Sequence, residues 1–93
     1  MIPQETIAKI FDSADIVEVI GDFIQLKKSG SNFKGLSPFA NEKTPSFMVS
    51  PGKRIFKDFS SGKGGNVVSF LMEHEHLSYP EALKWLANKY NIE

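Results

Sequence analysis

Residues 32–66 read NFKGLSPFANEKTPSFMVSPGKRIFKDFSSGKGGN, and this stretch decides the fold. It holds five of the eight phenylalanines and five of the seven glycines of the 93-residue chain. Short apolar runs alternate with turns that contain proline or glycine, which is typical of strands joined in an antiparallel sheet. The sequence on either side has a helical pattern, so we expect helices that support this sheet.

Four strands are predicted in the central part of the chain. Apolar and polar residues alternate at 23–28, and the turn Ser29-Gly30-Ser31 leads into a return strand at 32–36. Pro38 and Pro45 bracket a loop, because neither can donate a hydrogen bond to a ladder. The remaining two strands are expected at 46–49 and 54–59, joined by a Ser50-Pro51-Gly52-Lys53 turn with proline and glycine in its central positions.

Capping signals mark the predicted helices. Pro3 suits the first turn of an amphipathic helix, and Asp15 with Glu18 forms a capping box for a second helix that Gly21 would end in a left-handed conformation. Asn66 is expected to cap a third helix, and a box from Ser78 to Glu81 opens a fourth. The fold class is therefore a small α+β domain over residues 1–93, with four or five antiparallel strands flanked by N-terminal and C-terminal helices.

Charge is distributed unevenly, although the formal net charge is zero. Residues 27–63 have a net charge of +6, whereas residues 1–26 have −4 and residues 64–93 have −2. Basic residues interleaved with phenylalanines could form a platform for a single-stranded nucleic acid, since cations neutralise phosphates and ring faces stack on bases. The competing interpretation is that the lysines only solvate the sheet while the phenylalanines fill its core.

The absence of cysteine excludes disulfides and thiolate metal sites. It also fits a cytoplasmic location. No apolar run approaches the roughly 20 residues of a membrane span. His74 and His76 would point about 200° apart on a helix, so a packing or solvated role is favoured over a metal site. No catalytic constellation is visible, and Gly62-Lys63-Gly64-Gly65 is interpreted as a tight turn rather than as a phosphate-binding loop.

The central stretch resembles the N-terminal zinc-ribbon domain of bacterial DnaG-type DNA primase. The similarity rests on Asn32-Phe33-Lys34-Gly35-Leu36, on Glu42-Lys43-Thr44-Pro45-Ser46-Phe47 and on Gly62-Lys63-Gly64-Gly65-Asn66, and it extends into both flanks. The family's three cysteines and one histidine fall here at Ser37, Ala40, Asp58 and Ser61. None of these residues supplies a thiolate or imidazole, which indicates a natural zinc-free branch or, as the alternative, an engineered knockout.

The resemblance implies template binding in a primase. It predicts a single-stranded DNA template, a separate catalytic domain beyond residue 93 that binds magnesium and makes the RNA primer, and a replicative helicase as partner. This segment itself would be non-catalytic and without a cofactor. The expected DNA contacts are Lys34, Lys43, Phe47, Arg54, Phe56, Lys57 and Lys63, with Phe33 as a further stacking candidate, whereas Phe39 and Phe59 are expected in the core.

Two further interpretations stay open. The domain could be a protein-interaction module that docks on a primase catalytic domain, or it could belong to the replicative primase of a mobile element. In place of zinc, we expect hydrogen bonds from Ser37 and Ser61 to an ionised Asp58, together with packing by Leu36, Phe39 and Phe59. The alternative is that Asp58 points to solvent.

Overall fold

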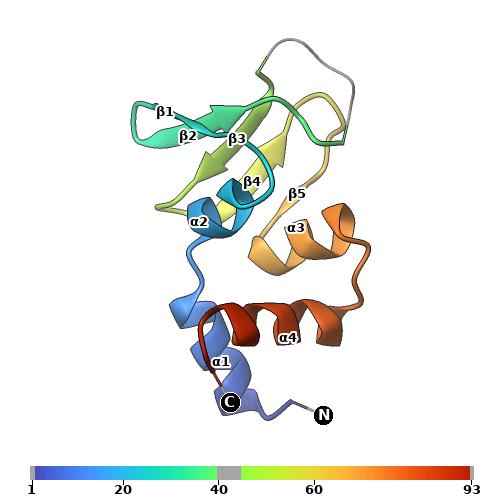
Figure 1. The fold of residues 1–93 in the computed structure, drawn as a ribbon. Coiled ribbons are helices and arrows are strands. Elements are labelled where there is room, and N and C mark those ends of the chain that lie inside the picture. The colour runs from blue at the N-terminus through green and yellow to red at the C-terminus, as the bar shows by residue number, and fades with distance from the viewer. Residues whose placement is uncertain (1, 40–44, 93) are drawn as a thin grey trace.

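The computed structural model describes residues 2–39 and 45–92. Five strands form one antiparallel sheet, and two helices precede it while two follow it (Figure 1). This confirms the α+β class and the five-stranded form of the prediction. In chain order the elements are α1 (Gln4–Ser13), α2 (Ile16–Gly21), β1 (Lys27–Ser29), β2 (Asn32–Gly35), β3 (Phe47–Ser50), β4 (Ile55–Asp58), β5 (Gly64–Gly65), α3 (Val67–His74) and α4 (Tyr79–Lys89).

The sheet is a simple meander in the order β1-β2-β3-β4-β5. Ser29 pairs with Asn32, so the first hairpin has a two-residue loop in which Gly30 takes a φ of 65°. The first strand is shorter than predicted, because the amides of Phe23 and Ile24 both donate to the Ile20 carbonyl and continue the turn of α2. Local helical hydrogen bonding therefore overrides the alternating pattern at the start of this segment.

The loop between β3 and β4 is longer than the predicted turn. Ser50 pairs with Ile55, which leaves four residues, 51–54, in the loop. Arg54 takes the left-handed conformation there with a φ of 58°, whereas Gly52 does not. The chain therefore reverses over residues 51–54, one residue later than the turn predicted at residues 50–53.

The fifth strand consists of two glycines that have no strand pattern in the sequence. Gly64 pairs with Lys57, and Gly65 pairs with Phe56. A side chain on Gly65 would lie 2.6 Å from Ser69 Oγ, and the φ of this residue is 149°. Glycine is therefore required where β5 passes close to the first turn of α3.

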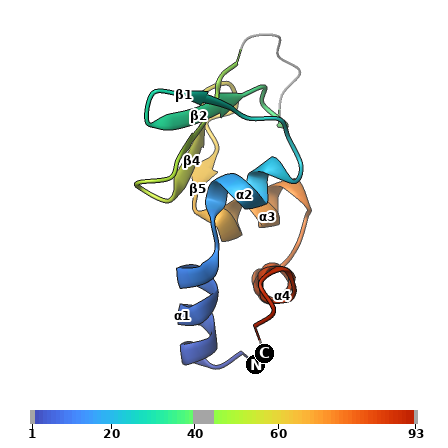
Figure 2. The same cartoon turned by 60° about the vertical axis from the view of Figure 1, so that its left-hand side comes forward.

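The inner face of the sheet packs on α2 and α3 (Figure 2). Phe47, Val49 and Phe56 point inward and are almost completely buried. The Phe70 ring lies edge-on to both Phe47 and Phe56, at centroid distances of 6.1 and 5.6 Å. These rings form the centre of the hydrophobic core between the sheet and the helices.

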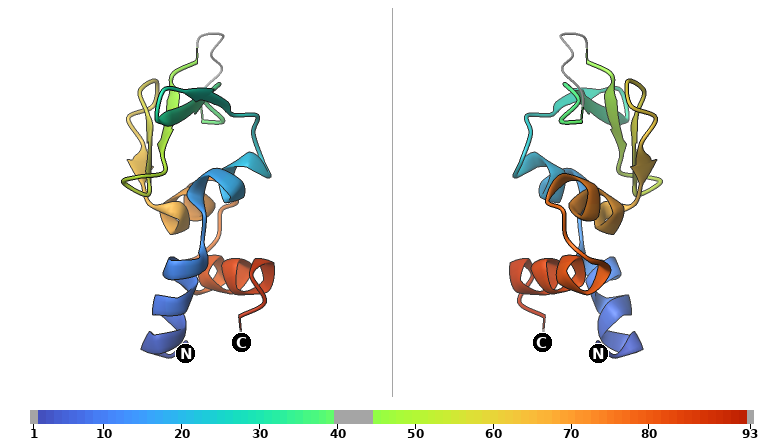
Figure 3. Two further views of the ribbon diagram at one scale, coloured as in Figure 1. Left: turned by 90° about the vertical axis from the view of Figure 1, so that its left-hand side faces the viewer. Right: turned by 90° about the vertical axis from the view of Figure 1, so that its right-hand side faces the viewer.

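The helices α1 and α4 form a second layer on the far side of α2 and α3 from the sheet (Figures 1 and 3). Ile10 of α1 and Leu83 and Leu86 of α4 are buried there. The two ends of the described chain lie near each other at this end of the molecule. The outer face of the sheet is consequently free of helices.

Caps on three helices follow the sequence signals. The side chains of Asp15, Asn66 and Ser78 accept hydrogen bonds at the starts of α2, α3 and α4, and the box from Ser78 to Glu81 is complete. Gly21, by contrast, is the last residue of α2 and has no left-handed φ, so the prediction of its stop conformation is wrong.

The Tyr90 hydroxyl completes the cap of α2 in place of Glu18. The hydroxyl accepts from the Asp15 amide at 3.1 Å and donates to Glu18 Oε1 at 2.6 Å. Tyr90 follows α4, so this bridge joins the two ends of the sequence. Burial and the hydrogen bond to Glu18 raise the pKa of Tyr90 to about 12, which keeps the donor protonated.

Replacing Tyr90 by phenylalanine should therefore lower the free energy of unfolding by about 1–2 kcal/mol, because the Asp15 amide and Glu18 lose a shared partner. Urea unfolding at neutral pH measures the change. Tyr79→Phe is the matched control, since the Tyr79 hydroxyl makes no hydrogen bond within residues 2–39 and 45–92. Equal stabilities of the two variants would contradict a structural role for the bridge.

Candidate nucleic-acid interface

A row of residues paired across the strands places positive charge on the outer face of the sheet. Lys27 pairs with Lys34, Lys34 with Met48, and Met48 with Lys57. Side chains that are paired in this way project from the same face of a sheet. The three lysines are exposed, and we call Lys27, Lys34 and Lys57 the lysine row.

No acidic side chain opposes the lysine row on the described strands. Their single acidic residue is Asp58, which alternates to the inner face and is fully buried. Lys57 donates one hydrogen bond to the Gly62 carbonyl at 3.2 Å and keeps two further donors. The outer face therefore presents three cations with donors available to an anion.

The structure brings together only part of the predicted cationic set. Lys34 and Lys57 lie in the row. Lys27 also lies in it, although it was not among the predicted DNA contacts. Lys63 lies elsewhere, because it pairs with Glu73 of α3 at 2.9 Å and lies 5.8 Å from the centre of the Phe39 ring. Arg54 lies in the loop 51–54 near the junction of α1 and α2. Lys43 is outside the described residues.

The two aromatic residues predicted to stack on bases are in the core. Phe47 is completely buried, and Phe56 has an exposed fraction of 2%. Neither ring can present a face to a base, so the stacking interpretation is wrong for both. Phe33 is half-buried against the core.

Phe59 is the aromatic ring that the sequence interpretation placed wrongly. It was expected in the core, yet its exposed fraction is 68%. Its amide donates to the Ser46 carbonyl at 3.0 Å, which continues the pairing of β3 with β4 by one residue. Phe59 therefore follows the alternation of Lys57 onto the outer face. Strict two-residue periodicity along 55–59 was the signal that could have found it.

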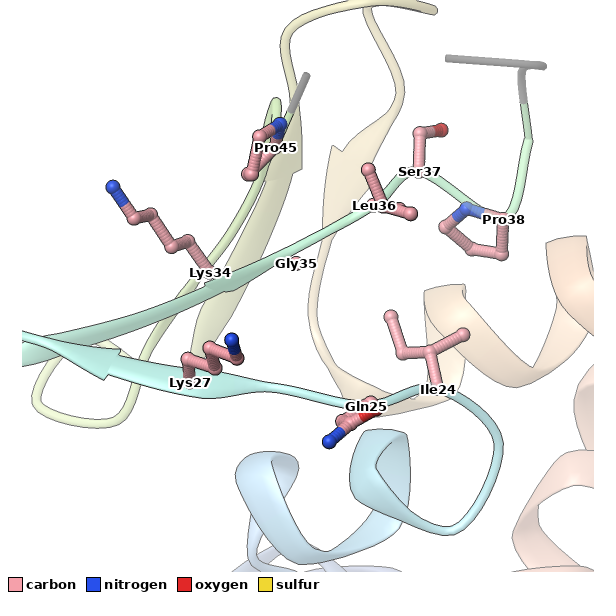
Figure 4. A pocket seen from close by; sticks show the side chains of 9 residues that line it. All are labelled: Ile24, Gln25, Lys27, Lys34, Gly35, Leu36, Ser37, Pro38 and Pro45. Carbon is pink, nitrogen blue, oxygen red and sulfur yellow. The ribbon is translucent and has the colours of Figure 1, made fainter. Parts of the chain in front are cut away.

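A groove of about 590 Å³ adjoins the lysine row (Figure 4). Ile24, Leu36 and Pro38 gather at one end of it, and Lys27 and Lys34 lie at the other end. Apolar atoms make up most of its lining. The groove is thus divided into an apolar end and a cationic end.

The Asp58 carboxylate joins the segment after β2 to the turn after β4 on the inner side of the sheet. We call this edge of the sheet the sheet end. Ser37, which follows β2, donates to Oδ2 at 2.6 Å, and Ser61 in the turn after β4 donates to the same oxygen at 2.5 Å. Ser60 donates to Oδ1 through its hydroxyl at 2.9 Å and through its amide at 3.3 Å. The predicted hydrogen bonds from Ser37 and Ser61 are confirmed, and the alternative that Asp58 points to solvent is wrong.

The carboxylate remains charged because its hydrogen bonds favour the ionised form. Burial raises the pKa of Asp58, but the hydrogen bonds from Ser37, Ser61 and Ser60 together outweigh burial and hold this pKa below its ordinary value. Two backbone bonds strengthen the same turn, since the Asp58 amide donates to the Lys63 carbonyl and the Gly62 amide donates to the Asp58 carbonyl, both at 2.8 Å.

Of the three residues predicted to pack around this cluster, Phe39 is the one that lies against the core. The Phe39 ring lies 6.2 Å from Phe47, 6.3 Å from Phe56 and 6.0 Å from Phe70, measured between centroids. Leu36 and Phe59 have exposed fractions of 51% and 68%, so the prediction that they form a substitute core is wrong. The strand alternation that turns Ser37 and Asp58 inward turns their neighbours Leu36 and Phe59 outward.

The residues at this cluster do not fit a zinc ion. Zinc in structural sites is bound by cysteine thiolates and histidine nitrogens, whereas Ser37, Asp58 and Ser61 offer one carboxylate and two hydroxyls. Ala40, the fourth position, is outside the described residues. Across residues 2–39 and 45–92 there is no group of three or more side chains of metal-ligating type. In the same ranges, no helix is long and apolar enough to cross a membrane.

The two other features singled out in the sequence have structural roles. His74 stacks on Phe70 at a centroid distance of 5.1 Å and contacts Glu75 at 2.9 Å. Gly62 takes a φ of 79° in the turn after β4, as a tight turn requires.

Comparison with known proteins identifies relatives along almost the whole chain. The CHC2 zinc finger family matches residues 2–93. DNA primases of Listeria monocytogenes and Geobacillus stearothermophilus are 53% and 52% identical over 92 residues, which is 99% of this chain. The chain spans only 15% of the length of these relatives.

A solved structure shares the fold as well. The crystal structure of the zinc-binding and RNA polymerase domains of the Aquifex aeolicus primase superposes with a TM-score of 0.89 and 42% sequence identity. The match covers 95% of this chain and 22% of that one.

Asp58→Ala should lower the free energy of unfolding by about 2–4 kcal/mol, because it leaves the buried Ser37 hydroxyl without its acceptor and frees the turn after β4. Phe59→Ala should cost less than about 1 kcal/mol, since most of that ring is already in water. Urea unfolding of both variants measures the difference. A larger loss for Phe59→Ala would show that packing at the sheet end, rather than the Asp58 cluster, joins the two turns.

Proposed function

The chain belongs to the CHC2 zinc-ribbon family of DnaG-type DNA primases, and from this membership we propose that it binds the single-stranded DNA template. The observation that carries the proposal is the lysine row, which the described strands leave unopposed by any acidic side chain on the outer face. Cations placed side by side bind phosphates by releasing the counterions of the DNA, independently of base sequence.

The register of the sheet defines a path for the strand. Neighbouring β-strands are about 4.8 Å apart, so Lys34 lies about 5 Å from Lys27 and about 10 Å from Lys57 across the sheet. The row runs perpendicular to the β-strands. A DNA strand that follows the row therefore crosses the sheet from β1 to β4, with its phosphates along the lysines.

Phe59 supplies the stacking surface in this proposal. Its exposed ring lies at the end of β4, two residues from Lys57 on the same face. Stacking of a base on an aromatic ring is tolerant of sequence, because every base has a π face. The ring and the lysine row together form the kind of platform that single-strand-binding proteins use.

The rest of the proposal concerns the parent protein. We infer that this segment serves a primase whose catalytic domain lies outside the present sequence and carries the magnesium and the nucleotides. The segment cooperates with that domain in starting an RNA primer, and a replicative helicase is the expected further partner. A metal-free state is part of this proposal, and the donor set of the Asp58 cluster supports it, because hydroxyls and one carboxylate stand where the family has thiolates and an imidazole.

Protein docking is the second candidate. A groove of about 450 Å³ between α1 and α4, lined by Ile2, Ile10, Ala87 and Ile92 among others, offers an apolar surface on the opposite layer from the sheet. A docking module of this kind would show little salt-dependent affinity for DNA. The two candidates are therefore separable by one titration of the chain with labelled DNA.

Lys34→Ala and Lys57→Ala should each weaken binding of single-stranded DNA of any sequence. Each should also reduce the slope of log affinity against log salt concentration by about 0.7, because one fewer phosphate is neutralised. Fluorescence anisotropy at several salt concentrations measures both quantities. Lys84→Ala on α4 is the control and should leave the slope unchanged. Equal losses at Lys84 would indicate diffuse attraction instead of a site on the sheet.

A further inference from the structure

The groove beside the lysine row has an apolar end and a positively charged end, which are the two surfaces that bind the base and the phosphate of a nucleotide. Its apolar end is formed by Ile24, Leu36 and Pro38, and its other end by the lysines of β1 and β2 (Figure 4). Leu36 is a large apolar side chain with an exposed fraction of 51%, and no packing role accounts for its exposure. A base is a flat, largely apolar body joined to an anionic phosphate, so the two ends of the groove match the two ends of a nucleotide.

The floor of the groove is narrow because β2 passes close to the chain that leads into β1. A side chain at Gly35 would lie 2.6 Å from the Gln25 carbonyl oxygen. The groove therefore has a backbone floor with Leu36 and Ile24 as its walls. Gln25 lines this space, and its side chain makes no hydrogen bond within the described residues.

We propose that this groove binds one base of the single strand, with Leu36 and Ile24 against the base and with Lys27 and Lys34 on the adjoining phosphate. The inference rests on the proposed function and adds a defined base subsite to it. A volume of about 590 Å³ is within the range of small-ligand sites. Among the described residues that line the groove, the charged ones are Lys27 and Lys34, which favours an anionic occupant such as a nucleotide over a neutral peptide.

The subsite continues the lysine row without a break. Lys34 belongs to both features, since it lies in the row and lines the groove. A strand that crosses the sheet along the row therefore arrives at the groove on the β1–β2 side. Phe59 takes a base at the β4 end, so the two base contacts lie near the two ends of the lysine row.

The test compares a six-residue oligodeoxythymidylate with an abasic strand of the same length. Leu36→Ser should weaken binding of the thymidylate strand by roughly 5- to 100-fold, because the base loses an apolar contact of about 1–3 kcal/mol. It should change affinity for the abasic strand by less than about twofold, because the phosphates still reach the lysines. Met72→Ser is the matched control, since Met72 is an exposed aliphatic residue on α3, away from the groove and from the outer face of the sheet.

A second experiment detects a base in the groove itself. Methyl NMR signals of Leu36 and Ile24 should shift when the thymidylate strand is added, because a bound base carries a ring current, and they should not shift with the abasic strand. If the wild-type chain binds the thymidylate strand while Leu36→Ser weakens both strands equally, or neither, the subsite is overturned and the template-binding proposal stands. If the wild-type chain binds neither strand, both proposals are overturned.

Discussion

The Asp58 carboxylate is the constraint on which the sheet end depends. It accepts hydrogen bonds from a serine after β2 and from two serines in the turn after β4, so one buried charge joins two turns that are distant in sequence. Each hydrogen bond to a charged group contributes about 1.5–3 kcal/mol. The Phe39 ring adds packing against the core from the side of the first turn. The core of a domain of this size is modest, so hydrogen bonds of this strength contribute a substantial part of its net stability.

The hydrogen bonds to Asp58 also determine which side chains lie on the outer face of the sheet. Ser37 and Asp58 must point inward to meet, and residues that precede or follow them in an extended chain must then point outward. Leu36 and Phe59 are these neighbours, and both are exposed beside the lysine row. The same alternation of side chains therefore places the Asp58 cluster on the inner face and the apolar residues of the interface on the outer face. Loss of the cluster is expected to disorder the apolar contacts of the interface before it disturbs the lysines of β1 and β2.

Much of this architecture was predictable from local signals. The caps at Asp15, Asn66 and Ser78, the first hairpin and the hydrogen bonds from Ser37 and Ser61 to Asp58 all appear as expected. The sequence could not show β5, since two glycines have no side chains to alternate. Residue type also could not separate buried from exposed phenylalanines. Phe56 and Phe59 are the same residue in similar sequence surroundings, and only the register of β4 places Phe56 on the inner face and Phe59 on the outer face. The Tyr90 bridge to α2 depends on tertiary packing, which no local pattern encodes.

Thermal unfolding in excess chelator shows whether hydrogen bonds to Asp58 take the structural place of a metal. Structural zinc contributes on the order of 10 kcal/mol to the folding of small metal-dependent domains. The melting temperature should be the same with and without chelator, and elemental analysis of the purified chain should find no stoichiometric zinc. A melting temperature that falls in chelator and recovers on addition of zinc would contradict this role of Asp58.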